Sequence, residues 1–306
     1  STLNGDIVYR NYMNLTINSG CTLSVSNMCR GLWIRVRGTL TLNGTISMSN
    51  KGCYIAGGGS DLYLCYSDIK VPAVGAAGAP RRTPNSTEGV YGGDGYNGSN
   101  GTDGQCGGGG GGGAAYTNSS FHSGAGAAGG VFGGGTGGSG SIGGCIGGYL
   151  YVSGEDGQAY GLRGGNGASG SISGYSVRSG GGAGGVTGGT SGGSSTAGGV
   201  GSGGILIVMA NHIVGSGSLL AQGASGGHGS RVGSDVNNIY GASGGGSGGG
   251  SITLFYYTIS GTPTLNAPGG AGGAGGAGNA YSAGGNGGAG SCRDYSLAEL
   301  LSHTRV

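Results

Sequence analysis

Charged side chains are scarce in this sequence. Asp, Glu, Lys and Arg make up 8% of the residues, and the formal net charge is +2. Nucleic-acid-binding surfaces need clustered positive charge, and Arg81–Arg82 is the only basic pair. The 11 acidic residues form no convincing carboxylate pair or nucleophile–base set. We therefore expect neither nucleic-acid binding nor enzymatic activity.

Proline and long apolar runs are also rare. The chain has 5 Pro and no regular Gly-X-Y register, which excludes a collagen triple helix. No apolar run approaches the roughly 20 residues that a membrane-spanning helix needs. We therefore expect no membrane span.

Metal and cofactor motifs are missing as well. The four histidines, His122, His212, His228 and His303, have no metal-ligand spacing. Matches to GxGxxG occur by chance at this glycine content, and none has the strand, helix and acidic residue of a nucleotide site. Asp94 and Asp103 lie in a stretch that hints at calcium-binding nonapeptides, but the aliphatic position is missing, which favours a polar loop. We predict no metal and no cofactor.

The seven cysteines include no CxxC pair. Cys21 with Cys29, or Cys53 with Cys65, are candidate disulfides if the protein functions outside a cell. The alternative is that they are small buried apolar residues.

Glycine is what the chain has in abundance. It contributes 88 of 306 residues, about four times its usual share. Ordering each glycine costs roughly 0.5–1 kcal/mol more than ordering alanine, so another interaction has to offset the cost. Stretches such as Ala267–Gly278, APGGAGGAGGAG, repeat a small side chain followed by two glycines. This period of three predicts a bundle of polyglycine-II helices joined by backbone hydrogen bonds.

A unit of strand, glycine turn, strand and glycine tract recurs at Gly31–Gly52, Gly204–Gly227 and Ser251–Gly273. Leu32, Ile34 and Val36 alternate with Trp33, Arg35 and Arg37, which is typical of a half-buried strand. Ile205–Met209 is apolar throughout and suits a strand covered on both faces, ending in a break at Ala210–His212. The repetition predicts an all-β fold of β-solenoid-like units beside the polyglycine-II bundle. Three unrelated hairpins are the alternative.

The chain divides into three predicted regions. Residues 1–70 form an N-terminal β-domain for attachment or capping. Its predicted short strands are Ile7–Tyr9, Leu15–Ile17, Thr22–Val25, Leu32–Val36, Thr39–Leu42 and Ile46–Met48, and Tyr63–Tyr66 and Ile69–Val71 are the candidates for another. Residues 71–290 form the glycine-rich region, with β-repeats at 145–152, 204–222 and 251–266. Residues 291–306 form a tail in which Ser296–Glu299 is a capping-box pattern that predicts a short C-terminal helix.

Tyrosine dominates the aromatic residues, with 17 Tyr against 3 Phe and 1 Trp. Many tyrosines stand in islands within glycine tracts, where binding loops use this residue for its large contact area and its hydroxyl. The alternative is that they clamp the edges of the glycine bundle. The candidate receptor-binding residues are Tyr91, Tyr96, Tyr116, Phe121, Tyr160, Tyr175, Tyr240 and Tyr281.

Apolar β-units that lead into GGxGGxGG tracts with aromatic islands resemble the glycine-rich adhesins and tail-fibre proteins of tailed bacteriophages. The resemblance covers roughly Val71–Gly290 and is one of composition and period. It implies a virion structural protein, outside the cell, that attaches to other virion or fibre subunits. Through distal loops it would bind a host cell-surface receptor, either protein or glycan. A homo-oligomer is compatible with this architecture.

Two further functions fit the pattern. One is a self-assembling extracellular filament or surface-layer protein without a receptor, which polymerisation of the purified protein would favour. The other is an ice-binding protein, which the β-repeats and scattered arginines fit less well.

Overall fold

The computed structural model describes residues 7–29, 31–52, 62–64, 69–71, 144–145, 170–172, 175–177, 203–226, 231–232, 239–240, 246–273 and 285–298. Most of the glycine tracts over which the polyglycine-II bundle was predicted lie outside these ranges. Within the described residues, no helix is long and apolar enough to cross a membrane.

Ten strands build two parallel sheets. The large sheet has the order β1-β4-β11-β15-β17, with β2 also paired to β4, and the small sheet has the order β3-β5-β12-β16. The strands of the large sheet are β1 (Ile7–Tyr12), β2 (Leu15–Ile17), β4 (Gly31–Leu42), β11 (Ile205–Val214), β15 (Ser251–Ser260) and β17 (Ser291–Ser296). Those of the small sheet are β3 (Thr22–Ser24), β5 (Thr45–Ser47), β12 (Ser218–Leu220) and β16 (Thr264–Asn266).

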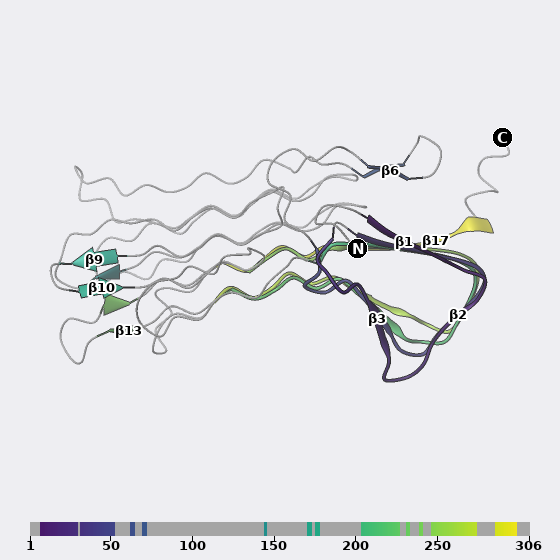
Figure 1. Ribbon diagram of the computed structural model, residues 1–306, viewed down its shortest axis with the longest axis horizontal. Helices are drawn as coiled ribbons and strands as arrows, with labels where there is room; N and C mark the ends of the chain where they lie inside the picture. Colours follow the sequence, from purple (N-terminus) through teal and green to yellow (C-terminus); the bar gives the residue numbers. More distant parts are fainter. Residues whose placement is uncertain are drawn as a thin grey trace.

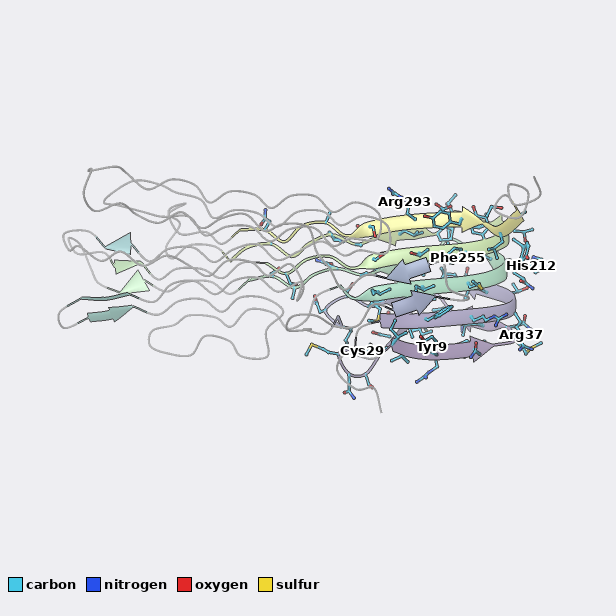
Figure 2. All side chains as sticks on the ribbon, turned by 90° about the horizontal axis from the view of Figure 1, so that it is seen from above. Tyr9, Cys29, Arg37, His212, Phe255 and Arg293 are labelled. Atoms are coloured by element: carbon cyan, nitrogen blue, oxygen red, sulfur yellow. The ribbon has the colours of Figure 1, made fainter. Side chains whose placement is uncertain are left out.

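Seven shorter strands form separate antiparallel pairings. They are β6 (Leu62–Leu64) with β7 (Ile69–Val71), β9 (Gly170–Ile172) with β10 (Tyr175–Val177), and β14 (Ile239–Tyr240) between β13 (Arg231–Val232) and β8 (Gly144–Cys145). Figure 1 places β9, β10 and β13 at the end of the molecule opposite the two parallel sheets, and the view from above in Figure 2 agrees.

Strands β4, β11 and β15 of the large sheet each turn a corner and continue as the short strands β5, β12 and β16 of the small sheet (Figure 1). Glycine makes this corner possible where β11 and β15 end. Gly215 and Gly261 have φ values of 103° and 116°, which side-chain-bearing residues rarely adopt. A Cβ atom on Gly261 would meet the backbone of Gly215, so the corners of successive layers stack in direct main-chain contact.

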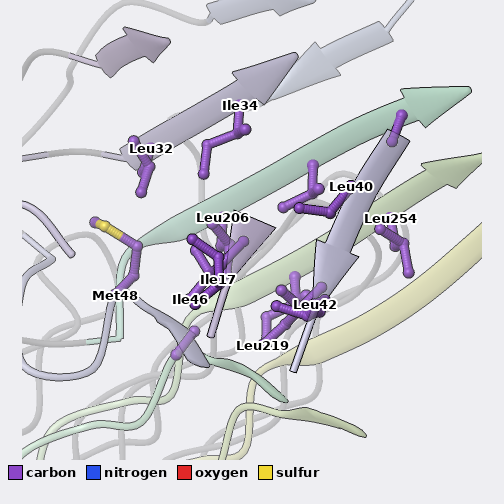
Figure 3. Close-up of a cluster of buried hydrophobic side chains, with 14 of the residues drawn as sticks. Ile17, Leu32, Ile34, Leu40, Leu42, Ile46, Met48, Leu206, Leu219 and Leu254 are labelled. Carbon is purple, nitrogen blue, oxygen red and sulfur yellow. The ribbon is translucent and has the colours of Figure 1, made fainter. Parts of the chain in front are cut away.

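The core lies between the two sheets and consists of rows of apolar side chains that run across the strands. One row joins Val8, Leu32, Leu206 and Ile252 in the large sheet, and another joins Leu23, Ile46, Leu219 and Leu265 in the small sheet. Figure 3 shows Leu32, Leu206, Ile46 and Leu219 among the side chains that fill the space between the sheets. Because neighbouring strands pair in register, apolar residues lie beside apolar residues along each row, and the residues inside the rows are buried.

Beyond the strands, four glycine-rich stretches pack through their main chains. We call residues 221–226, 246–250, 267–273 and 285–290 the glycine segments. The N–H groups of Gly223 and Gly226 donate to the carbonyls of Pro268 and Ala271 at 2.9 and 2.8 Å, and those of Gly246 and Gly249 donate to Gly285 and Gly288 at 2.9 and 3.0 Å. A Cβ atom on Gly270, Gly287 or Gly290 would collide with a carbonyl of a neighbouring segment, and one on Gly250 would collide with the carbonyl of Gly204. Here hydrogen bonds and backbone contact replace side-chain packing.

The predicted fold class is wrong as it was stated. Of the predicted C-terminal motif, Ser296 ends strand β17, which pairs in parallel with β15, and Leu297 and Ala298 after it are helical; residues from Glu299 onward lie outside the described residues. What the structure supports is a strand-rich arrangement with parallel sheets and almost no helix in the described residues, which agrees only loosely with an all-β class. The described residues do not test the solenoid-like and polyglycine-II parts of that prediction.

The predicted break at Ala210–His212 is also wrong. Strand β11 continues to Val214, and its register with β4 shifts between Ala210 and His212, which pair with Val36 and Thr39. Two residues of β4 therefore face Asn211 alone, which is a β-bulge. The Asn211 side-chain amide donates to the carbonyl of Arg37, so the irregularity keeps a hydrogen bond.

Strands from both sides of the predicted boundary at residue 70 belong to the same sheets. β4 and β5 pair with β11 and β12, across the intervening glycine-rich sequence. The predicted repeats at 204–222 and 251–266 coincide with β11–β12 and β15–β16. Within the predicted β-repeat at 145–152, the structure describes only Cys145, as the end of β8.

Candidate functional site

The predicted receptor-binding residues fall mostly outside the described part of the chain. This applies to Tyr91, Tyr96, Tyr116, Phe121, Tyr160 and Tyr281. The other two, Tyr175 and Tyr240, lie on strands β10 and β14, where Tyr175 pairs with Ile172 and Tyr240 pairs with both Arg231 and Gly144. Their role in binding stays a prediction.

The strand pairing around Tyr240 joins three segments that are distant in sequence. β14 lies between β13 and β8, so residues near 144, 231 and 240 belong to one three-stranded antiparallel sheet. The strand pair β9–β10, with Tyr175, lies at the same end of the molecule as β13 (Figure 1). We call the strands β8, β9, β10, β13 and β14 the small-strand end. Strands that are up to about a hundred positions apart in the sequence, from β8 to β14, therefore lie at one end of the molecule (Figure 1).

The face of the large sheet that points away from the core carries a second cluster, which the sequence did not single out. Ile207 and Phe255 are buried in it, and Trp33, Ile205, Met209, Tyr295 and Leu297 pack against them. The rings of Tyr9 and Trp33 lie 5.3 Å apart, and those of Phe255 and Tyr295 stack at 5.4 Å. Seen together, Figures 1 and 2 place β6 over this face.

Polar groups gather where β4, β11 and β15 approach the corner. His212 Nδ1 and Thr258 Oγ1 are 2.7 Å apart on neighbouring strands, and both residues are exposed. Arg37 lies near the same end of the large sheet as His212 (Figure 2). Tyr257 is 43% exposed one residue before Thr258. The alternation in Leu32–Arg37 predicted the exposed arginines, but the sequence held no signal that His212 and Thr258 pair.

The cysteine predictions are tested only in part. Cys21 carries a free, exposed thiol, so the candidate pair with Cys29 is not formed. The buried thiol of Cys29 donates to the carbonyl of Gly31 at 3.3 Å. Cys53 and Cys65 lie outside the described residues. Burial raises the pKa of the Cys292 thiol, while a backbone hydrogen bond at Ala267 and the charge of Arg293 act in the opposite direction.

Among the described residues, no group of three or more His, Cys, Asp or Glu side chains is placed to hold a metal ion. Comparisons with known protein families, curated proteins and solved structures find no match for this chain. The function therefore has to be argued from the geometry alone.

Proposed function

We propose that this protein is a virion structural protein without enzymatic activity, a tail-fibre-associated adhesin that recognises a host cell-surface receptor. The observation that supports the proposal is the separation of two ends. One end is a stack of parallel sheets with a fully buried apolar core, and the other is the small-strand end. Such a division suits a protein that is held at one end and binds at the other.

The small-strand end has the composition that recognition calls for. It carries Tyr175 and Tyr240, and strand β13 begins with Arg231. Tyr and Arg are enriched among the residues that contribute most to the affinity of protein interfaces. Because these strands come from separate parts of the chain, changes in several segments can alter one binding surface.

The test is binding of the fluorescently labelled full chain to a panel of bacterial strains, measured by flow cytometry. Tyr175→Ala and Tyr240→Ala should each weaken binding about tenfold or more, the usual effect of removing a tyrosine that contributes strongly to an interface. Tyr257→Ala is the matched control, because Tyr257 is an exposed tyrosine on the large sheet.

Two results would contradict the proposal. One is unchanged binding in the Tyr175→Ala/Tyr240→Ala double variant. The other is an equal loss of binding in Tyr257→Ala. Immunogold labelling of phage particles provides a separate check, because the proposal expects the chain at a tail fibre.

A further inference from the structure

The two outermost strands of the large sheet, β1 and β17, each have one neighbouring strand among the described residues. Within the described residues, β1 pairs only with β4 and β17 pairs only with β15. Figure 2 shows Tyr9 and Arg293, which mark these strands, at opposite edges of the sheet. An outermost strand presents unpaired N–H and C=O groups to which a further strand can bind.

One side-chain row ends in groups of opposite charge at these two edges. Ile34, Val208 and Leu254 form one buried row across the inner strands. The same row ends in Arg10 on β1 and in Asp294 on β17, and both are exposed. An apolar row thus has a cation at one end and an anion at the other.

The neighbouring row ends in a second complementary pair. Trp33, Ile207 and Thr253 occupy its interior, Tyr9 ends it on β1 and Arg293 ends it on β17. Tyr9 is 50% exposed, and Arg293 is exposed too. An arginine over a tyrosine ring is an attractive cation–π contact.

We propose that a second copy of this chain binds through its β1 edge to the β17 edge of the first, in parallel and in the register of the sheet. This arrangement places Arg10 of one copy opposite Asp294 of the other, and Tyr9 opposite Arg293. Two β1 edges brought together would face arginine with arginine, and two β17 edges would face aspartate with aspartate. The charges therefore select the head-to-tail pairing.

Charged residues at sheet edges also serve to prevent strands from adding. The two roles make opposite predictions. If Arg10 and Asp294 only guard the edges, the protein is monomeric and removing a charge increases association. If they select a partner, the protein associates and reversing one charge weakens that association. Head-to-tail pairing of this kind is compatible with an adhesin and with a filament subunit alike.

The experiment measures association of the full chain by sedimentation velocity over a range of concentrations. Arg10→Asp and Asp294→Arg should each associate at least tenfold more weakly than the unsubstituted chain, which corresponds to about 1.4 kcal/mol. An equal mixture of the two variants should regain association, since each then meets an edge of opposite charge. Arg35→Asp, on the inner strand β4, is the matched control and should associate like the unsubstituted chain.

A cross-link tests the register independently. Val8 and Cys292 end the same row, and adjacent strands lie about 4.8 Å apart, within the range of roughly 4.4–6.8 Å for disulfide-bonded Cα atoms. Val8→Cys should give disulfide-linked multimers under mild oxidation, and Val8→Cys/Cys292→Ser should not. A monomeric unsubstituted chain, a mixture that fails to associate, or multimers that persist without Cys292 would each overturn the proposal.

Discussion

The stacked sheets and the glycine segments pack by opposite means. Between the sheets, side chains such as Leu219 and Ile46 fill the space, and deleting atoms would leave a cavity. In the glycine segments the main chains touch, and adding a single carbon atom would force backbone atoms apart. One chain therefore contains two kinds of interior, one destabilised by lost side-chain volume and the other by added volume.

Leu219→Ala tests the side-chain interior and should have the largest effect. Leu219 is fully buried in the row between Ile46 and Leu265. Its truncation should lower the free energy of unfolding by about 2–5 kcal/mol, measured by urea denaturation. Leu220→Ala is the control, because its side chain is only half-buried on the same strand, and it should cost clearly less. Equal losses in the two variants would show that this row is not a close-packed core.

Gly250→Ala tests the backbone interior. The added methyl group would meet the main chain of Gly203 and Gly204, so strand β15 would have to shift. Overpacking of this kind costs about 1–3 kcal/mol, read from the same denaturation curves. Gln222→Ala serves as the control in a neighbouring segment, since Gln222 is exposed and its substitution should stay within about 0.5 kcal/mol. A neutral Gly250→Ala would contradict the distinction between the two interiors.

Ser247→Ala sharpens the comparison at a point where a side chain enters the glycine segments. Ser247 is fully buried, and its hydroxyl accepts a hydrogen bond from the Ala224 N–H at 2.7 Å. Removing it should cost about 1 kcal/mol in the free energy of unfolding, because a buried donor loses its acceptor. Ser216 makes the matched bond to the Thr262 N–H at 3.1 Å but is exposed. Water can replace the Ser216 hydroxyl as the acceptor for the Thr262 N–H, so Ser216→Ala should leave the free energy of unfolding nearly unchanged.

The smallest of the expected effects is a difference in the rate at which the thiols of Cys21 and Cys292 are alkylated. Because burial raises the pKa of Cys292, its thiolate fraction is low near neutral pH. Cys21 is exposed and should be alkylated by iodoacetamide faster than Cys292, as followed by peptide mass spectrometry. Since the folded pKa of Cys292 is raised, its contribution to stability is present below the unfolded pKa and is lost as pH rises through the folded pKa. Faster labelling of Cys292 than of Cys21 would contradict its burial.

The strands were predictable where burial alternates or is continuous. Leu32–Val36 alternates as expected, and Leu206, Ile207 and Val208 are buried in a strand covered on both faces. The break at Ala210–His212 was predicted wrongly because it was placed where the apolar run Ile205–Met209 ends. The sheet accommodates them in a β-bulge, where the Asn211 side chain hydrogen-bonds to the backbone.

The start of the C-terminal helix was a local property of the sequence. Ser296–Glu299 has the pattern of a helix start, and in the structure Ser296 ends the pairing with β15 while Leu297 and Ala298 are helical. An N-cap residue keeps an extended backbone, so Ser296 can end a strand and precede a helix. The candidate site was less predictable, because the sequence named Tyr175 and Tyr240 without indicating that their strands pair with residues near 172, 144 and 231.

By itself the sequence determined which stretches extend and where no side chain is tolerated, because apolar alternation and glycine are local properties of the chain. Only the tertiary structure decided the strand order and register. β4 and β11 are paired neighbours, yet Arg37 on β4 and Asn211 on β11 are 174 positions apart in the sequence. Nothing in either strand alone indicates which other strand it pairs with. The physical reason is that each apolar row becomes a core only when layers from distant parts of the chain stack on it and exclude water.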